Sequence, residues 1–327
     1  MCDVYVYFLL FAALMCCGEP HPAFPDDITH GFCAASKFRF AGGTCTKDGK
    51  ATLKIGLSDM KGFKTTNLGT NAAVLGQKGK ESGAPRKYLA DPIDATVIVE
   101  STDGFVPLLK RPGHANHAPG QVDTPSGSPE PSASGIPLSS VVVVGGPTKA
   151  RRPGQRSSID AASIGPEIVQ SLFDAALTEV QDELNLPSDL VGSQKFLGMV
   201  RGAKVEGMLT AVFWVKFKGT LGDFQKRYEM GGKEEQSSEL ILAPVSQLSA
   251  LNTTEPGVVV SGCRSVVAPR GDGSKEATPS SSADADEEGQ TDVECDEMAP
   301  SAKAALELWR MHKQKLAARR RSTAGFL

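Results

Sequence analysis

The sequence of 327 residues has few aromatic side chains, no strong excess of charge and no regular spacing of cysteines. Aromatic residues make up 6% and the formal net charge is -3, so the chain lacks a basic field that would recruit nucleic acid by itself. The seven cysteines include no CxxC pair and no Cys/His cluster of zinc type, which argues against a disulfide framework and a zinc site. We therefore expect reduced thiols in a cytoplasmic protein without a nucleic-acid partner.

The sequence also lacks an apolar run that would cross a membrane easily. Its main apolar run, from Val4 to Cys17, has about 14 residues and no preceding Lys or Arg. This length is typical of the apolar part of a signal peptide, whereas the missing cations weaken a secretory interpretation. We predict an apolar leader at 1–24, with a first strand or a misplaced start codon as alternatives. A secretory or membrane-associated location, aided by acylation of Cys16 and Cys17, is the alternative to the cytoplasm.

Glycine and proline are frequent, with 34 and 21 residues, and hydrophobic residues make up 40% of the chain. This content is sufficient for one sizeable core or two small ones. The composition favours an α/β or α+β protein that disordered segments interrupt.

Short strands are predicted at several places along the chain. Two of them, at 36–40 and 51–59, are separated by a glycine-rich turn at Gly42–Gly43. The clearest hairpin is Asp94–Arg111, because two apolar runs flank the turn signal Asp103–Gly104. Further strands are predicted in the following segments: a hairpin of 195–202 and 206–219, a strand within 237–248, and either an edge strand or a locally packed segment at 140–146.

A helix is predicted to begin at Gly165–Glu167 and to end before Asn185–Pro187. Its acids Glu179, Asp182 and Glu183 lie at i, i+3 and i+4, so they share one face of the helix. The apolar residues at helical spacing form a different face: Phe173, Leu177, Val180 and Leu184. Because like charges repel, solvent, a basic partner or a bound cation must offset the acidic face.

Changes in composition suggest the organisation of the chain. We predict an N-terminal subdomain at 25–85 and a central domain at 86–250, which contains a Pro/Gly-rich loop insertion at 131–164. A disordered acidic insertion is predicted at 251–298. A helix and a basic tail follow at 299–327, with the cations toward the C-terminal end.

The acidic helix and its surroundings resemble the Nudix hydrolases. The segment "TEVQDEL", Thr178–Leu184, is similar to the core of the family signature, and "VDTPSGSPEP", Val122–Pro131, is similar to the loop that enters it. Glu179 matches the first acid of this core, and Asp182 and Glu183 match its closing pair. The blocks "YLADP", "DELNLP" and "FLGMVRG" further resemble the branch of the family that acts on UDP-glucose and UDP-galactose.

Three residues depart from the family pattern. Thr178 stands where the general signature has an Arg that orients the acids, and Gln170 stands where it has its first Glu. Ser126 replaces a Gly of the family motif "PGGHPEP". We expect Ser126 to reduce activity if that Gly needs a positive φ or lets a phosphate approach.

The resemblance implies a Nudix α/β/α sandwich with a mixed sheet, a small N-terminal β-rich subdomain and a C-terminal helix. It implies Mg²⁺-dependent hydrolysis of the pyrophosphate of a nucleotide-sugar substrate, with UMP and a hexose 1-phosphate as products and Mn²⁺ as an alternative ion. One alternative is a catalytically weak Nudix scaffold that binds a nucleotide or protein, and another is a hydrolase of a different nucleoside diphosphate derivative. Hexose preference and oligomeric state stay open.

The resemblance also implies the residues of the site. Glu179 and Glu183 are the expected catalytic acids and direct metal ligands, and Asp182 is the expected additional ligand; a solvated acidic face is the alternative. The residues expected to contact the substrate are Asp123, Lys110, Arg111, Thr66, Asn67 and Arg201. Helix capping, turn capping and ordinary surface exposure are the simpler alternatives for these residues.

Overall fold

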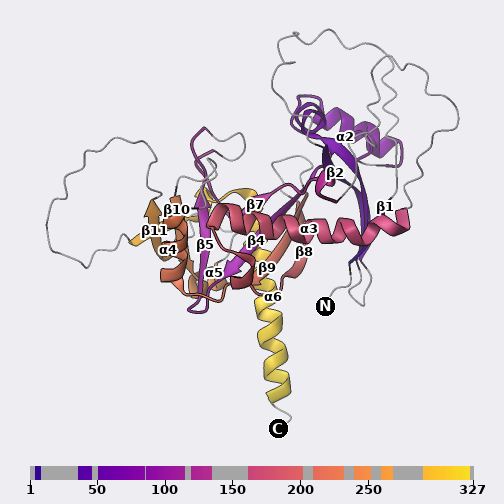
Figure 1. Ribbon diagram of the computed structural model, residues 1–327. Helices are drawn as coiled ribbons and strands as arrows, with labels where there is room; N and C mark the ends of the chain where they lie inside the picture. The colour runs from indigo at the N-terminus through magenta and orange to yellow at the C-terminus, as the bar shows by residue number, and fades with distance from the viewer. Residues whose placement is uncertain are drawn as a thin grey trace, which may run out of the picture. The chain divides into compact units, whose positions relative to one another are not determined.

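The computed structural model describes residues 4–8, 36–45, 51–84, 86–114, 119–134, 161–201, 209–231, 239–251, 259–267 and 290–324 (Figure 1). These residues form two units. Unit 1 comprises Met1–Ala95, Ser128–Ala175 and Arg201–Thr210. Unit 2 comprises Thr96–Gly127, Ala176–Val200 and Ala211–Leu327. The predicted edge strand at 140–146 lies outside the described residues.

Unit 1 contains a sheet of strand order β1-β3-β2. Strand β1 (Val4–Phe8) runs parallel to β3 (Ala51–Asp59), and β2 (Ser36–Cys45) runs antiparallel to β3. The two predicted strands are confirmed, but Gly42–Gly43 is not the turn between them. These glycines lie within β2 beside a β-bulge, and Gly42 has a φ of +128°, which side-chain-bearing residues rarely adopt.

Short helices follow β3 in unit 1. They are α1 (Met60–Gly62), the π-helical turn η2 (Phe63–Asn67) and α2 (Ala72–Glu81). The chain turns into α1 at Asp59, whose side chain accepts a hydrogen bond from the backbone N of Gly62 at 2.6 Å. The sequence of Lys61–Asn71 predicts a polar loop or the start of a helix, and it gives no clear signal for α2. The 3₁₀ turn η3 (Pro131–Ser134) also belongs to this unit.

Unit 2 contains an antiparallel sheet of strand order β12-β11-β10-β5-β6. Its strands are β5 (Phe105–Lys110), β6 (Val122–Asp123), β10 (Glu239–Pro244), β11 (Val259–Val267) and β12 (Gln290–Glu294). The prediction that 251–298 is disordered is therefore wrong for β11 and β12. The buried residues Val260, Cys263 and Val293 explain the difference, because they add to the apolar core and outweigh the acidic composition around them.

A second sheet has the strand order β7-β4-β9-β8. Its strands are β4 (Ile93–Glu100), β7 (Ser126–Gly127), β8 (Lys195–Arg201) and β9 (Leu209–Lys216). The predicted neighbours β8 and β9 are confirmed. The hairpin predicted at 94–111 is wrong in one respect: β4 and β5 flank a turn at Gly104, but they join different sheets. The turn is therefore a corner between the sheets.

Four further helices follow in the chain: α3 (Ala161–Leu184), α4 (Leu221–Met230), α5 (Val245–Ala250) and α6 (Pro300–Ala324). The helix α3 begins before the predicted start and contains Pro166. It ends as predicted, since Asn185 has a φ of +52°. The terminal helix α6 is confirmed, and α4 has no counterpart among the predictions. Within the described ranges, no helix combines the length and hydropathy needed to cross a bilayer.

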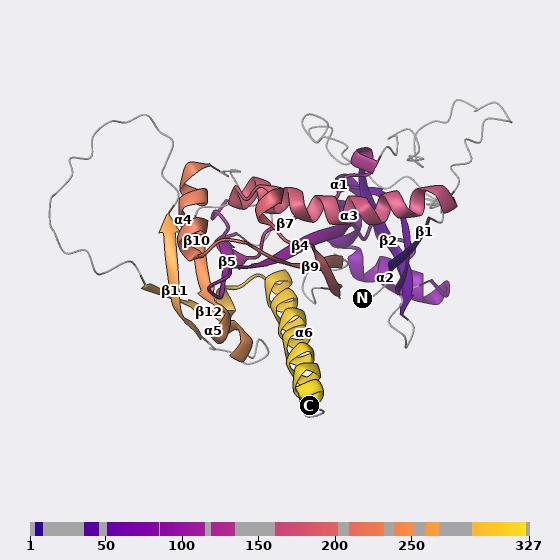
Figure 2. The same cartoon turned by 60° about the horizontal axis from the view of Figure 1, so that its bottom comes forward.

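The core of unit 2 gathers apolar side chains from both sheets and from α6. Trp309 of α6 is fully buried there, together with Leu306 and Ala305. Strand residues complete this core: Ile98, Val106, Leu108, Val212, Trp214, Ile241, Val260 and Val293. In Figures 1 and 2, α6 begins beside the strands of unit 2 and its C-terminal turns extend away from them. The mixed α/β class predicted from the sequence is confirmed.

Candidate functional site

The C-terminal turns of α3 meet the short strand β7 in unit 2. Glu183 is only 4% exposed, and its Oε2 accepts a hydrogen bond from the backbone N of Ser126 at 3.1 Å. A methyl group added to Gly127 would lie 1.8 Å from Oε1 of Glu179, so this carboxylate packs directly on the glycine backbone. The two acids that the sequence predicts to act together therefore lie against the same two residues of β7.

The two carboxylates form a site with an excess of negative charge. Burial raises the pKa of Glu183 well above its usual value, and the nearby charge of Glu179 raises it further. Arg111 and the backbone N–H of Ser126 act in the opposite direction, while Asp123 adds to the rise in this pKa. A site of this kind favours a cation that would offset the carboxylates.

The side chain of Arg111 links β6 to β7 through hydrogen bonds to one residue of each strand. Its Nε donates to Oδ2 of Asp123 at 2.9 Å, and its Nη2 donates to Oγ of Ser126 at 3.0 Å. Asp123 is 2% exposed, and its Oδ1 accepts from the backbone N of Thr124 at 2.9 Å and from Oγ of Ser301 at 3.3 Å. These contacts fix the position of the strand that touches both acids.

The other predicted site residues of unit 2 lie elsewhere. Asp182 is exposed, although it stands next to the buried Glu183 in the chain. Lys110 is half-exposed, and its Nζ lies 3.9 Å from Oε2 of Glu239. A contact of either residue with the substrate stays a prediction.

Thr66, Asn67 and Arg201 belong to unit 1. Oδ1 of Asn67 accepts from the backbone N of Ala90 at 3.0 Å, and its Nδ2 donates to Oδ1 of Asp91 at 2.8 Å. Oγ1 of Thr66 accepts from the backbone N of Ala90, the neighbour of Asp91, at 3.0 Å, and Nη1 of Arg201 lies 3.7 Å from Oδ2 of Asp91. All three therefore lie at or beside Asp91, a centre that sequence reasoning missed even though the block "YLADP" contains it.

Sequence reasoning also missed the part played by β7. The sequence identifies Ser126 only as a replacement for glycine. In the structure, its backbone N–H donates to Glu183 and its hydroxyl accepts from Arg111. The concern that this position needs a positive φ is not borne out. In the described part of the chain, Asp91 and Asn185 are the only non-glycine residues with a positive φ.

The residues present fit a divalent cation, but they supply only a few protein ligands. Within the described ranges, no group of three or more His, Cys, Asp or Glu side chains is arranged to hold a metal ion. Mg²⁺ is commonly held through only one or two carboxylates, with water and substrate phosphates as the remaining ligands. Glu179 and the buried Glu183 supply such a pair of hard oxygen donors.

Comparisons with known proteins define the family. No family model matches the chain. The uridine diphosphate glucose pyrophosphatase NUDT22 of Bos taurus is 30% identical over 227 residues, which cover 68% of this chain and 72% of that protein. The human protein of the same name is also 30% identical over 227 residues, covering 68% of this chain and 69% of its own length. The chain belongs to the Nudix hydrolase family.

A plant member of the family shows a more distant similarity. Nudix hydrolase 9 of Arabidopsis thaliana is 22% identical over 229 residues, which cover 68% of this chain and 69% of that protein. The solved structure of the Nudix hydrolase RenU from M. Smegmatis aligns with 48% of this chain over 73% of its own length, with 14% identity and a TM-score of 0.26.

As a Nudix hydrolase, the chain is an enzyme that hydrolyses pyrophosphate bonds.

Proposed function

We propose that this Nudix hydrolase cleaves the pyrophosphate of UDP-glucose and UDP-galactose in a Mg²⁺-dependent reaction. The names of the 30% identical relatives support this substrate class. The observation that carries the proposal is the pairing of Glu179 with the buried Glu183 against β7. The products are UMP and a hexose 1-phosphate.

Glu179 and Glu183 would hold the divalent cation, and Asp182 would assist from the exposed side of the same turn. When bound, the cation neutralises charge on the diphosphate oxygens. This role accounts for two carboxylates placed near each other where one of them is buried, an arrangement that repulsion and desolvation disfavour.

The remaining steps belong to residues of the chain. In the hydrolysis, the oxygen of water bonds to one phosphorus, and the bond from that phosphorus to the bridging oxygen breaks. The bridging oxygen leaves with the other phosphate, and Glu179, or a carboxylate from a later loop, orients the water and takes its proton. Arg111 holds Asp123 and Ser126, which keeps β7 and the two acids in position. Lys110, at the end of β5, is the further cation proposed to meet the diphosphate.

A cytoplasmic location is part of the proposal. In the described part of the chain, Cys263 and Cys295 are buried free thiols. Burial, with a further contribution from Asp292, raises the pKa of the Cys263 thiol to about 12. Free thiols agree with a reducing compartment.

The decisive test replaces the buried acid. Glu183→Gln keeps the size of the side chain and removes its charge, so we expect kcat for UDP-glucose with Mg²⁺ to fall at least about a hundredfold. Release of UMP from UDP-glucose, UDP-galactose and ADP-ribose, with and without Mg²⁺, is the measurement.

Glu167→Gln is the matched control, because Glu167 is an exposed acid of the same helix. We expect this control to keep the activity of the unaltered protein. Unchanged turnover in Glu183→Gln would refute the assignment of the acids. Tight UDP binding without turnover of any substrate would instead support the weak scaffold.

A further inference from the structure

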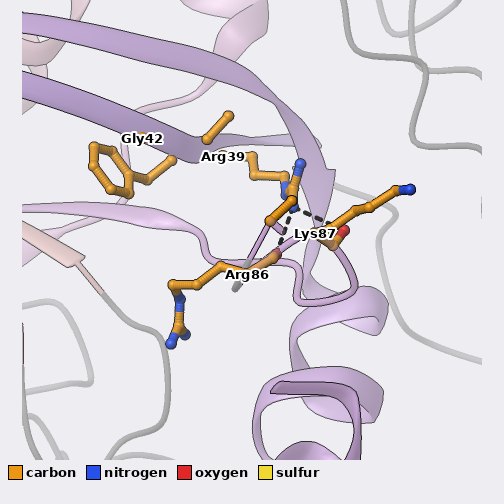
Figure 3. Close-up of a pocket in the computed structure, with 7 residues that line it drawn as sticks. Arg39, Gly42, Arg86 and Lys87 are labelled. Atoms are coloured by element: carbon orange, nitrogen blue, oxygen red, sulfur yellow. Dashed lines mark hydrogen bonds between the residues drawn. The ribbon is translucent and has the colours of Figure 1, made fainter. Parts of the chain in front are cut away.

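A cavity of about 450 Å³ in unit 1 lies beside Arg39, whose polar groups are already paired. Nε of Arg39 donates to the backbone O of Leu89 at 3.0 Å. Its Nη2 donates to the backbone O of Arg86 at 2.9 Å and of Lys87 at 3.1 Å (Figure 3). Arg86 in turn donates to the buried carboxylate of Asp91. Because these donors are engaged and the wall is largely apolar, the cavity indicates no particular ligand.

In unit 2, the start of α6 is fixed against β6. The backbone N of Ala299 donates to the backbone O of Val122 at 2.8 Å, and Met298 forms a parallel bridge with Val122. Met298 and Ala299 are both buried. Ser301, the second residue of α6, is therefore held beside Asp123, the second residue of β6.

One hydroxyl connects α6 to Asp123. Oγ of Ser301 donates to Oδ1 of Asp123 at 3.3 Å, and the same oxygen accepts from the backbone N of Thr124 at 2.9 Å. Asp123 is only 2% exposed, so bulk water cannot readily replace a lost donor. Without the hydroxyl, the N–H of Thr124 would be the remaining described donor to Oδ1, and the carboxylate would be free to turn.

Asp123 transmits its position to the acids of α3 through direct hydrogen bonds. Its Oδ2 accepts from Nε of Arg111 at 2.9 Å, and Nη2 of Arg111 donates to Oγ of Ser126 at 3.0 Å. The backbone N of Ser126 then donates to Oε2 of Glu183 at 3.1 Å. A turn of the Asp123 carboxylate therefore shifts Arg111, and with it the strand β7 that contacts Glu179 and Glu183.

We propose that Ser301 is a positioning residue for these acids, acting through Asp123 and Arg111. The inference rests on the proposed role of Glu179 and Glu183 as holders of the divalent cation. Groups that orient metal ligands from behind typically contribute about 10- to 100-fold to metal affinity or activity. Since Thr124 still holds Oδ1 when the hydroxyl is removed, we expect an effect at the lower end of this range.

The test replaces Ser301 in the full chain. Ser301→Ala removes the hydroxyl, and we expect kcat for UDP-glucose with Mg²⁺ to fall about tenfold. KM should change less than about twofold, because the residue acts on the acids and not on the substrate. Ser301→Thr keeps a hydroxyl on the same carbon and should restore most of kcat.

Binding of Mn²⁺ alone gives a readout that needs no turnover. Electron paramagnetic resonance of free Mn²⁺ during a titration gives the affinity of each variant. We expect Ser301→Ala to bind Mn²⁺ about tenfold more weakly and Ser301→Thr to bind it as the unaltered protein does. In the background of Asp123→Asn, Ser301→Ala should weaken Mn²⁺ binding by less than about twofold, since the connecting carboxylate is already altered.

Ser101→Ala is the matched control for a purely structural effect. Oγ of the buried Ser101 also donates to an aspartate, Oδ1 of Asp103, at 2.6 Å in the same unit. The backbone N of Phe105 donates to this hydroxyl, so its bonds stabilise the turn at Gly104. We expect the control to lower Tm while it keeps kcat and the Mn²⁺ affinity.

The outcomes separate the role of Ser301 from the proposed function. An unchanged kcat in Ser301→Ala overturns the proposal, as does an equal loss in Ser301→Thr or in Ser101→Ala. An effect on Mn²⁺ affinity that persists in full beside Asp123→Asn overturns the route through that carboxylate. If UDP-glucose is not hydrolysed, the proposed substrate is wrong, and the Mn²⁺ affinities of the Ser301 variants still decide its role. No binding of Mn²⁺ by the unaltered protein overturns both proposals.

Discussion

Gly127 lies so close to Glu179 that a side chain at this position would occupy the space of the carboxylate. A methyl carbon placed on Gly127 would lie 1.8 Å from Oε1, far below any contact distance, so the acid would have to move. Because β7 also contacts Glu183 through Ser126, the glycine helps to set the geometry of both acids.

We expect Gly127→Ala to lower kcat by about ten- to a hundredfold, because a displacement of about 1 Å in a reacting group has an effect of this size. Steady-state hydrolysis of UDP-glucose is the measurement. Gly76→Ala is the matched control, since Gly76 of α2 has no atom within 4 Å of the added carbon. That control should gain about 0.5–1 kcal/mol of stability and keep its activity. A normal kcat in Gly127→Ala would show that the position of Glu179 does not matter.

At the scale of the element, α6 is attached to the strands through a buried carboxylate. Glu100 of β4 accepts hydrogen bonds from Nζ of Lys313 at 2.9 Å and from Nε1 of Trp214 at 3.1 Å. Trp309, one turn before Lys313, is fully buried in the core of unit 2. The helix is therefore held by an apolar anchor and by an ion pair that is mostly protected from water.

His312 makes the stability of this attachment depend on pH. Burial lowers the pKa of His312, and the charges of Lys195, Lys315, Lys313 and Arg319 lower it further. The unfolded chain therefore binds the proton at a higher pH than the folded chain does. The stability that neutral His312 contributes is present above about pH 6.5 and is lost as the pH falls through the lower folded value.

We expect His312→Gln to reduce this loss. Urea unfolding between about pH 5 and pH 7.5 gives the free energy of unfolding, which should fall less steeply with acidification in the variant. The histidine faces Trp214 at a ring distance of 5.6 Å, so tryptophan emission can follow the transition. Parallel pH profiles of the two proteins would contradict a contribution from His312.

At the scale of the whole molecule, the candidate site lowers stability. Glu183 is buried near two other carboxylates, and glutamine in its place keeps the volume while removing the repulsion. In the presence of a chelator, we expect Glu183→Gln to raise Tm by about 2–4 °C, as removal of an unfavourable active-site charge often does. Glu167→Gln should leave Tm unchanged. A lower Tm for Glu183→Gln in differential scanning calorimetry would mean that the charge is well compensated.

Features with local causes are predictable from the sequence. The apolar stripe and the acids of α3, the stop at Asn185 and the strands β2, β3, β8 and β9 follow from periodicity and turn chemistry within short windows. The pairing of Glu179 with Glu183 follows from helical spacing, and Arg111 and Asp123 follow from the resemblance. Such signals depend on neighbours in the chain.

Features that depend on distant partners are not predictable in this way. The separation of β4 and β5 into different sheets is set by pairing with β9 and β10, far along the chain. Spacing likewise cannot tell that Glu183 is buried while Asp182 is exposed. The cluster at Asp91 combines Arg39, Arg86 and Arg201, which come from three separate parts of the sequence.

Both tryptophans of the chain, Trp214 and Trp309, lie in unit 2 where α6 joins the strands. Indole emission is therefore a built-in local probe that reports detachment of the terminal helix from these strands. Phe40→Trp would place a third indole in β2 of unit 1, and its emission could then be followed beside that of unit 2.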